Sequence, residues 1–238
     1  GLDPKIQKAV LEQGYTTPTP IQAQSIPHVL AGSDLMGAAQ TGTGKTAAFV
    51  LPIIQKILRH ASNSASPARH PIRALVLTPT RELAVQVADN AANYSKHTDL
   101  RAAVVYGGVD MKEQVGILRN GVEILIATPG RLLDHIGSKV ANLSQVEILV
   151  LDEADRMLDM GFIHDIKKLL KVIPVNNDFA LLRKYGFSKC LVGVYLGTNN
   201  ADVTQILGCY STDGGLSWTK TGRIIRCHSM RQPRRPMN

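Results

Sequence analysis

The stretch Ile148-Leu149-Val150-Leu151-Asp152-Glu153-Ala154-Asp155 decides how this chain is expected to fold. Four consecutive apolar residues are typical of a strand that is buried on both faces of a parallel sheet. Asp152 and Glu153 follow directly, so both carboxylates should lie at the carboxyl edge of that sheet, where α/β folds build their sites. An acidic tetrapeptide alone is a weak signal, because the first turn of a solvated helix is often rich in Asp and Glu.

A second motif, Ala39-Gln40-Thr41-Gly42-Thr43-Gly44-Lys45-Thr46, strengthens that signal. It follows an expected strand and opens an expected helix, which is the context that a phosphate-binding loop requires. Its glycines allow a tight turn that points N–H groups at phosphates, and the helix adds its positive end. We expect Gln40, Thr41, Gly42, Thr43, Gly44, Lys45 and Thr46 to bind a nucleotide. The general pattern begins with Gly, whereas Ala39 stands at that position here.

The two motifs together predict a site that splits a nucleoside triphosphate. Lys45 should reach the β- and γ-phosphates, and Thr46 and Asp152 should hold Mg²⁺. Glu153 is placed to orient and deprotonate the attacking water. The expected catalytic residues are therefore Glu153, Asp152 and Lys45.

Residues 1–175 alternate between strand-like and helical patterns, which predicts an α/β fold with a mostly parallel sheet and helices on both faces. The expected strands are Asp34–Gly37, Ala74–Leu77, Ala102–Tyr106, Ile124–Ala127 and Ile148–Leu151. The expected helices are Pro4–Gln13, Pro20–Ala31, Thr46–Arg59, Thr80–Ser95, Met111–Asn120 and Gly130–Ile136. Ala61–Pro71, which is rich in Ser, Ala and Pro, is expected to be a surface loop.

The pattern changes near Asn176, so we expect two domains, 1–176 and a β-rich tail at 177–238. The tail contains the β-prone run Leu191–Leu196, and the segments Ile206–Tyr210 and Leu216–Thr219 flank the hairpin signal Asp213-Gly214-Gly215. Its basic, proline-containing end, Arg231–Asn238, is expected to be disordered.

Composition is that of an ordinary globular protein with a basic excess, since 44% of the 238 residues are hydrophobic and the formal net charge is +8. Most of the excess lies in the tail, which also holds all three cysteines, Cys190, Cys209 and Cys227, at a spacing that fits no zinc pattern. No apolar run approaches the ~20 residues of a membrane span, and no signal peptide opens the sequence. We expect a cytoplasmic protein, and Gly1 in place of Met suggests a trimmed fragment.

With these motifs in place, residues 1–175 resemble the first RecA-like domain of a DEAD-box RNA helicase, near the bacterial RhlE branch. Gly14-Tyr15-Thr16-Thr17-Pro18-Thr19-Pro20-Ile21-Gln22 is similar to the family's Q motif. The resemblance implies that Gln22 pairs with the N6 and N7 edge of adenine and that Tyr15 belongs to the same nucleotide site. ATP, with Mg²⁺, is therefore the expected cofactor.

Three further motifs resemble the family's RNA-binding loops. They are Pro79-Thr80-Arg81-Glu82-Leu83 (motif Ia), Gly107-Gly108 (the GG element) and Thr128-Pro129-Gly130-Arg131 (motif Ib). The resemblance implies that Pro79, Thr80, Arg81, Gly107, Gly108, Thr128, Pro129, Gly130 and Arg131 line a groove for RNA. Hydroxyl, N–H and guanidinium groups would contact phosphates and 2′-hydroxyls there without reading bases. Taken singly, Thr80 could cap the helix that follows, and 128–130 could be a plain turn.

The resemblance stops after Asn176. There the family continues with a strand that ends in Ser-Ala-Thr, and neither this motif nor the arginine-bearing second RecA-like domain has a counterpart in this sequence. In the family the missing strand runs between the phosphate-loop strand and the strand 148–151. An empty slot would leave backbone groups unpaired at about 1–3 kcal/mol each. We therefore expect Leu191–Leu196 or Phe179–Leu182 to fill it.

The sequence thus predicts an ATP-dependent RNA helicase represented by its first domain, with weak ATP binding and slow turnover in this chain, since the arginines of a second domain are missing. The alternative is a catalytically poor fragment that binds nucleotide and RNA. A third reading gives the function to the tail, because Ser211–Trp218 resembles the Asp-box hairpin of sialidase-like β-propellers. The RNA, the pathway, the oligomeric state and the origin of the tail (natural, fused or mis-joined) stay open.

Overall fold

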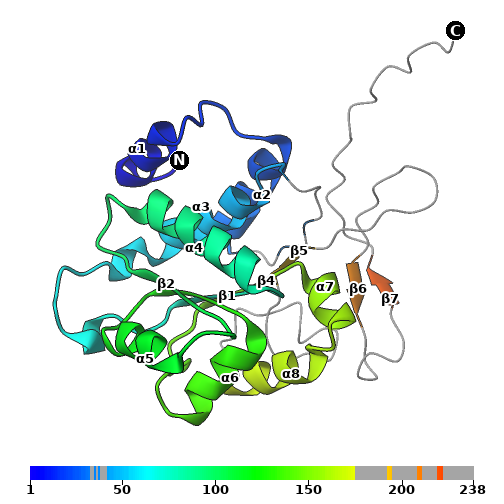
Figure 1. Ribbon diagram of the computed structural model, residues 1–238. Coiled ribbons are helices and arrows are strands. Elements are labelled where there is room, and N and C mark those ends of the chain that lie inside the picture. Colours follow the sequence, from blue (N-terminus) through cyan, green and yellow to red (C-terminus); the bar gives the residue numbers. More distant parts are fainter. Residues whose placement is uncertain are drawn as a thin grey trace, which may run out of the picture.

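The computed structural model describes residues 1–32, 35, 37 and 42–174, together with the backbone of three short strands in the tail. Helices and strands alternate along this part of the chain (Figure 1). The α-helices are α1 (Pro4–Glu12), α2 (Pro20–Leu30), α3 (Lys45–Ile57), α4 (Arg81–Ser95), α5 (Met111–Arg119), α6 (Pro129–Gly137), α7 (Ala154–Asp159) and α8 (Ile163–Val172). The strands are β1 (Ala74–Leu77), β2 (Ala102–Val105), β3 (Ile124–Ala127), β4 (Ile148–Asp152), β5 (Val192–Val194), β6 (Gly208–Tyr210) and β7 (Thr219–Thr221), and short 3₁₀ helices lie at Leu58–His60 and Pro67–Arg69.

The main sheet has the strand order β2-β3-β1-β4-β5, and each pair of neighbouring strands in it is parallel. Parallel neighbours require a crossover, and the helices between the strands supply it. The alternation of elements in the sequence therefore predicted the fold class correctly.

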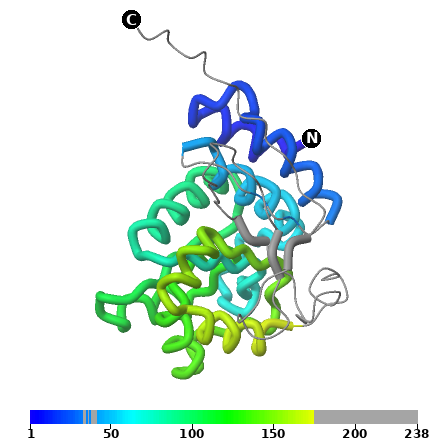
Figure 2. Tube along the Cα trace, turned by 90° about the vertical axis from the view of Figure 1, so that its right-hand side faces the viewer, coloured from blue at the N-terminus to red at the C-terminus, as the bar shows by residue number. Residues whose placement is uncertain are grey.

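Side chains that alternate along each strand build two separate cores, one on each face of the sheet. Val76, Ile126 and Val150 belong to the core on the side of α1, α3 and α4. Leu75 and Leu125 point to the opposite face, toward α6 and α8. Both views place the first helices on one side of the sheet and α5, α6 and α8 on the other (Figure 1 and Figure 2). The strands are buried on both faces, which explains why they are uninterrupted apolar runs.

Most expected boundaries lie within two residues of the observed ones. The expected strand 102–106 ends one residue early, at Val105, because the backbone carbonyl of Tyr106 accepts a hydrogen bond from the Gln114 side chain instead. The expected helix 46–59 begins at Lys45, and its last turn becomes the 3₁₀ helix 58–60. Of the expected strand 34–37 only Leu35 and Gly37 belong to the described residues, and Gly37 forms an isolated bridge.

Two helices, α7 and α8, were not predicted. Met157 is fully buried, whereas Leu158 and Phe162 are half-buried. Ile166 and Leu169, three residues apart on α8, complete that part of the core and carried a helical signal.

In the tail, β5 lies within the run 191–196 and pairs in parallel with β4, Val150 opposite Val192 and Asp152 opposite Val194. This confirms the expectation that a tail segment fills the position beside the strand 148–151. The alternative segment, 179–182, lies outside the described residues. The expected hairpin is present as the antiparallel pair β6–β7, but its second strand begins at Thr219 rather than Leu216. Its turn, 213–215, and the basic end, 231–238, are not described.

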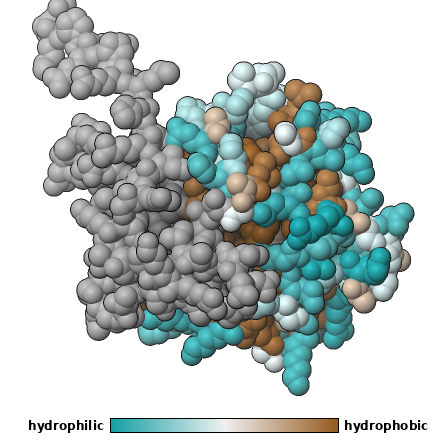
Figure 3. Space-filling model, turned by 180° about the vertical axis from the view of Figure 1, so that it is seen from behind, coloured by the Kyte–Doolittle hydropathy of each residue, from teal (hydrophilic) through white to brown (hydrophobic). Residues whose placement is uncertain are grey.

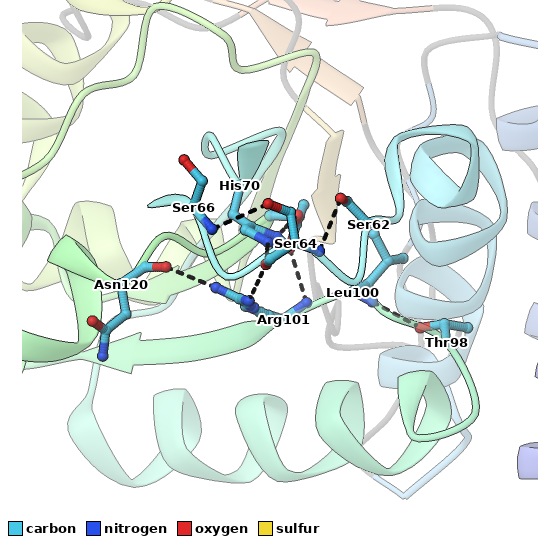
Figure 4. A network of polar contacts seen from close by, with 9 residues as sticks. Ser62, Ser64, Ser66, His70, Thr98, Leu100, Arg101 and Asn120 are labelled. Atoms are coloured by element: carbon cyan, nitrogen blue, oxygen red, sulfur yellow. Dashed lines mark hydrogen bonds and ion pairs between the residues drawn. The ribbon is translucent and has the colours of Figure 1, made fainter. Parts of the chain in front are cut away.

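A polar network closes the amino edge of the sheet (Figure 4). His70 donates through Nε2 to the Ser64 carbonyl at 2.7 Å, and its Nδ1 lies 2.6 Å from a carboxylate oxygen of Glu123. Arg101 donates its backbone N–H to the same carboxylate and a guanidinium N–H to Ser64. The expected surface loop 61–71 is therefore anchored to residues that directly precede β2 and β3.

Hydrophilic side chains dominate the described surface seen from behind, with hydrophobic ones toward the middle of that face (Figure 3). A search of the described helices finds none with both the length and the apolar character to cross a membrane.

Candidate functional site

The carboxyl ends of four parallel strands stand in a row. Ala127 at the end of β3 is level with Val105 of β2 and with Leu77 of β1, and Leu77 is level with Leu151 of β4. The GG loop follows β2, motif Ib follows β3, motif Ia follows β1, and the acidic pair begins at Asp152, the last residue of β4. Neighbouring strands lie about 4.8 Å apart, so all four motifs fall within about 15 Å along one edge.

The described part of the phosphate loop has the backbone that its glycines predict. Gly42 and Gly44 have φ of 78° and 86°, in the left-handed region that favours glycine, and Gly44 caps the start of α3. Lys45 and Thr46 form the first turn of that helix, where N–H groups and the helix dipole favour an anion. Gln40 and Thr41 lie outside the described residues.

Gln22 joins this loop to α2. Its side-chain oxygen accepts the Thr19 N–H at 3.0 Å, and its amide nitrogen donates to the Gly44 carbonyl at 3.1 Å. A Cβ on Gly44 would press on that amide nitrogen, which is the end of a flexible side chain, so it is the positive φ of Gly44 that requires glycine at this position. The side-chain oxygen of Thr19, beside the same glycine, is buried and has no hydrogen-bond partner among the described residues.

Tyr15, the other expected adenine residue, packs against α4. Its ring lies 6.3 Å from that of Tyr94, centroid to centroid, and the two hydroxyl groups are 3.5 Å apart. The ring is about half exposed, whereas Tyr94 is buried. The structure thus pairs Tyr15 with the helix that begins at motif Ia.

Asp152 is a buried carboxylate at the carboxyl edge, only 4% exposed. Burial raises the pKa of Asp152 to about 6, against the opposing effect of the nearby positive charge of Lys45, and the carboxylates of Glu153 and Asp155 add to the increase. The charge of Lys45, at the start of α3, therefore reaches Asp152 at the end of β4.

Glu153 has an unusual backbone. Its φ of 50° and ψ of 49° place it in the left-handed region, and the only other described non-glycine residue with positive φ is Lys139. Such strain persists where the surroundings hold it, and it clusters at functional sites. The Glu153 carboxylate lies 3.2 Å from a guanidinium nitrogen of Arg156, one turn into α7.

Of the motif Ia residues, Thr80 and Pro79 support the fold, whereas Arg81 is exposed. The Thr80 hydroxyl accepts the Leu83 N–H at 3.3 Å and so caps α4, which was the plain role considered for it. Pro79 is buried. Arg81 is exposed and forms an ion pair with Glu82, so its guanidinium is accessible to a charged ligand.

The GG and Ib loops lie beside each other. Gly107 and Gly108 are exposed, and Gly108 has a φ of 85°. Thr128 and Pro129 are buried at the start of α6, and Gly130 is half-buried. Arg131 was expected to contact RNA, but its side chain is only 11% exposed and donates to the Val109 carbonyl at 3.0 Å.

Two residues of this region were not predicted from the sequence. Gln114 and His135 are buried polar residues that hydrogen-bond to each other, 3.1 Å from Nε2 to Oε1. The sequence could have indicated that both are buried, because each has the helical spacing from an apolar residue. Gln114 lies four residues before Leu118, and His135 lies three residues after Leu132. A search of the described residues finds no group of three or more His, Cys, Asp or Glu placed to hold a metal ion.

Comparison with known proteins gives a consistent result. A family model described as "DEAD/DEAH box helicase" matches residues 19–186. The chain is similar to the ATP-dependent RNA helicase CshA of Listeria monocytogenes, 48% identical over 181 residues, which are 76% of this chain and 33% of that protein. It is also similar to the DEAD-box ATP-dependent RNA helicase RhpA of Helicobacter pylori, 45% identical over 174 residues, which are 73% of this chain and 34% of that protein. The chain spans about a third of the length of these curated relatives.

Proposed function

The chain belongs to the DEAD/DEAH box helicase family, and we propose that it is the ATP- and RNA-binding first domain of an ATP-dependent RNA helicase. One observation carries the proposal. The acidic pair and the three RNA-type loops stand at the carboxyl ends of four adjacent parallel strands and occupy the same edge of one sheet. A change in the ligand bound at one strand end can therefore affect the loop at the neighbouring strand end through the packed core.

The nucleotide would lie between the phosphate loop and the acidic pair. Backbone N–H groups of residues 42–44 and the first turn of α3 suit the phosphates, with Gln40 and Thr41 continuing the same loop. Lys45 adds a positive charge whose effect reaches Asp152. Gln22 and Tyr15 would contact adenine, and Gln22 would then exchange its present partners, Thr19 and Gly44, for the base.

The donor set also fits Mg²⁺. The carboxylate of Asp152 is buried and costly to ionise without a cation, as its raised pKa indicates. Asp152 and the hydroxyl of Thr46 would hold the ion, which would neutralise charge on the phosphate oxygens. Glu153, whose backbone is fixed at the start of α7, would accept the proton of the attacking water.

RNA would lie across the other three strand ends. The exposed guanidinium of Arg81, the N–H groups of Gly107 and Gly108, and the start of α6 at Thr128, Pro129 and Gly130 are suited to phosphates. These groups present no edge-specific pattern to bases, so we expect binding to be independent of sequence. The work would take place in the cytoplasm, where ATP and RNA are both available.

We assign these sites to a domain at about 1–176, with residues 177–238 as a tail that lends it one strand. In the whole protein, unwinding would require the remaining domain, whose arginines would stabilise the transition state at the phosphates. For this chain alone we expect ATP binding with slow turnover.

Two substitutions test the nucleotide site. Lys45→Ala should abolish detectable binding of magnesium-complexed ADP in titration calorimetry, whereas Glu153→Gln should keep binding but lower the hydrolysis rate at least ~100-fold, because it removes a general base. Glu113→Gln, on the exposed face of α5, is the matched control and should bind and hydrolyse nucleotide as the parent does. The proposal fails if Lys45→Ala binds as the parent does. A parent that binds nucleotide but hydrolyses none above background is the catalytically poor fragment.

A further inference from the structure

The GG loop, residues 106–110, is held at two points by side chains from the neighbouring helices. The amide nitrogen of Gln114 donates to the Tyr106 carbonyl at 3.0 Å. The guanidinium of Arg131 donates to the Val109 carbonyl, also at 3.0 Å. These two carbonyls flank the two glycines and are turned toward α5 and α6.

The glycines between the two contacts are left open. A Cβ added at Gly107 or Gly108 would meet no atom within 4 Å. Within the described residues, no acceptor is found for either glycine N–H. With the neighbouring carbonyls turned inward, these N–H groups are free to meet a phosphate.

The Tyr106 carbonyl fixes the orientation of the Gln114 amide, and this in turn sets the contact with His135. A carbonyl oxygen can only accept, so the nitrogen of the Gln114 amide must face Tyr106 and its oxygen must face His135. Nε2 of His135 therefore carries the hydrogen in this contact, and Nδ1 holds a lone pair. Protonation of Nδ1 would put a second buried cation on the face of α6 that carries Arg131, and burial, with the Arg131 charge, lowers the pKa of His135.

We propose that Gln114, His135 and Arg131 form a brace that sets the conformation of the GG loop for RNA, and that they are positioning residues rather than RNA contacts. The inference rests on the proposed function of the loop. Arg131 acts through the Val109 carbonyl, because its side chain is largely buried and its Nη2 donates to that carbonyl. Gln114 and His135 are fully enclosed and reach the loop only through Tyr106.

The test uses Gln114→Met in the full chain. This change keeps most of the volume but removes both hydrogen bonds, so the loop should lose its fixed conformation. We expect the ¹⁵N order parameters of Gly107 and Gly108 to fall below those of the parent. The Kd for single-stranded oligouridylate, with Mg²⁺ and a non-hydrolysable ATP analogue, should rise about ten-fold, and the Kd for Mg·ADP should stay within two-fold.

Two further variants separate the brace from a general loss of stability. His135→Gln retains an N–H donor for Gln114 and should restore most of the RNA affinity that His135→Leu loses. Ser95→Ala removes another buried side-chain hydrogen bond, that to the Ala91 carbonyl on α4, and should leave both affinities unchanged.

The results distinguish the two proposals. Unchanged order parameters in Gln114→Met, or lowered ones with parental RNA affinity, overturn the brace while the RNA site stands. Loss of nucleotide and RNA affinity together shows that Gln114 supports the fold in general, and also overturns the brace. A parent that gives no RNA binding although its glycine order parameters are high overturns the proposed function itself.

Discussion

At the scale of the residue, the site contains two unfavourable features, a buried carboxylate and a strained backbone. Asp152 is an acid in an environment that disfavours its charge, and Glu153 is a non-glycine residue in the left-handed region. Both features cost stability in a ligand-free chain. A bound cation would relieve the first, which links the chemistry of the site to the stability of the fold.

The raised pKa of Asp152 predicts how stability depends on pH. Its folded pKa is about 6 and its ordinary value is 3.8, so between these values the folded chain binds more protons than the unfolded chain. Stability should therefore be highest below the lower value and fall as the pH rises through about 6. The full cost is on the order of 3 kcal/mol, because one pKa unit corresponds to about 1.4 kcal/mol.

Asp152→Asn, in the absence of nucleotide, should remove this dependence and raise the unfolding temperature at pH 7.5 by several degrees. Thermal unfolding from pH 4 to 8 measures it, with Asp159→Asn, exposed at the end of α7, as the control. Parallel curves for the parent and Asp152→Asn over that range would contradict the prediction.

At the scale of the element, the carboxyl edge of the sheet carries loops suited to ligands, whereas the amino edge is held by polar contacts. Loops at the carboxyl edge carry open glycines and helix starts. At the amino edge, by contrast, polar side-chain contacts join the segments: His70 with Glu123, and Arg59, His60 and Arg73 with Glu147. A rigid amino edge supports the strands whose other ends must accept ligands.

The buried pair His70–Glu123 should contribute far more to the free energy of unfolding than the exposed pair Arg59–Glu147. The side chains of His70 and Glu123 are both 0% exposed, so His70→Leu would leave a buried carboxylate with the Arg101 N–H as its remaining hydrogen-bond donor. We expect a loss of about 3–5 kcal/mol in the free energy of unfolding, measured with urea.

Arg59→Leu provides the comparison, because Arg59 is 68% exposed in its pair with Glu147, and should cost at most about 1 kcal/mol. Both variants should still bind nucleotide, which belongs to the opposite edge. Equal losses in the two variants would show that burial does not set the strength of these pairs.

At the scale of the whole molecule, the sheet is completed by a segment far along the chain. β5 pairs with β4 through Val192, Gly193 and Val194, beyond the boundary expected at residue 176. This pairing satisfies backbone groups of β4 beside Asp152, where unpaired groups would cost about 1–3 kcal/mol each. The tail is thus part of the structural support of the nucleotide site.

A proline in β5 tests that support. Gly193→Pro removes a backbone N–H from the strand and should lower the unfolding temperature by several degrees, because the edge of β4 loses its partner. Lys220→Pro, in β7, should have a much smaller effect, since β7 pairs only with β6 in the described residues. If Gly193→Pro unfolds at the temperature of the parent, β5 does not support the sheet.

Much of the fold was predictable because it depends on local patterns. The strands 74–77 and 124–127 were predicted to the residue, since continuous apolar runs bounded by polar turns leave little choice. The helices α7 and α8 were missed, although Ile166 and Leu169 on α8 are three residues apart, as on one face of a helix. Thr80 was predicted both as a cap and as an RNA contact, and the structure confirms the cap.

The sequence by itself determined the order of strands and helices, the phosphate loop and the acidic pair, because each is encoded within a few consecutive residues. The tertiary structure decided that β5 pairs with β4 on the side away from β1, that His70 meets Glu123, and that Arg131 turns inward to Val109. These are contacts between residues distant in sequence. They are selected by which buried polar groups can find partners once the sheet has formed, and no local pattern carries that information.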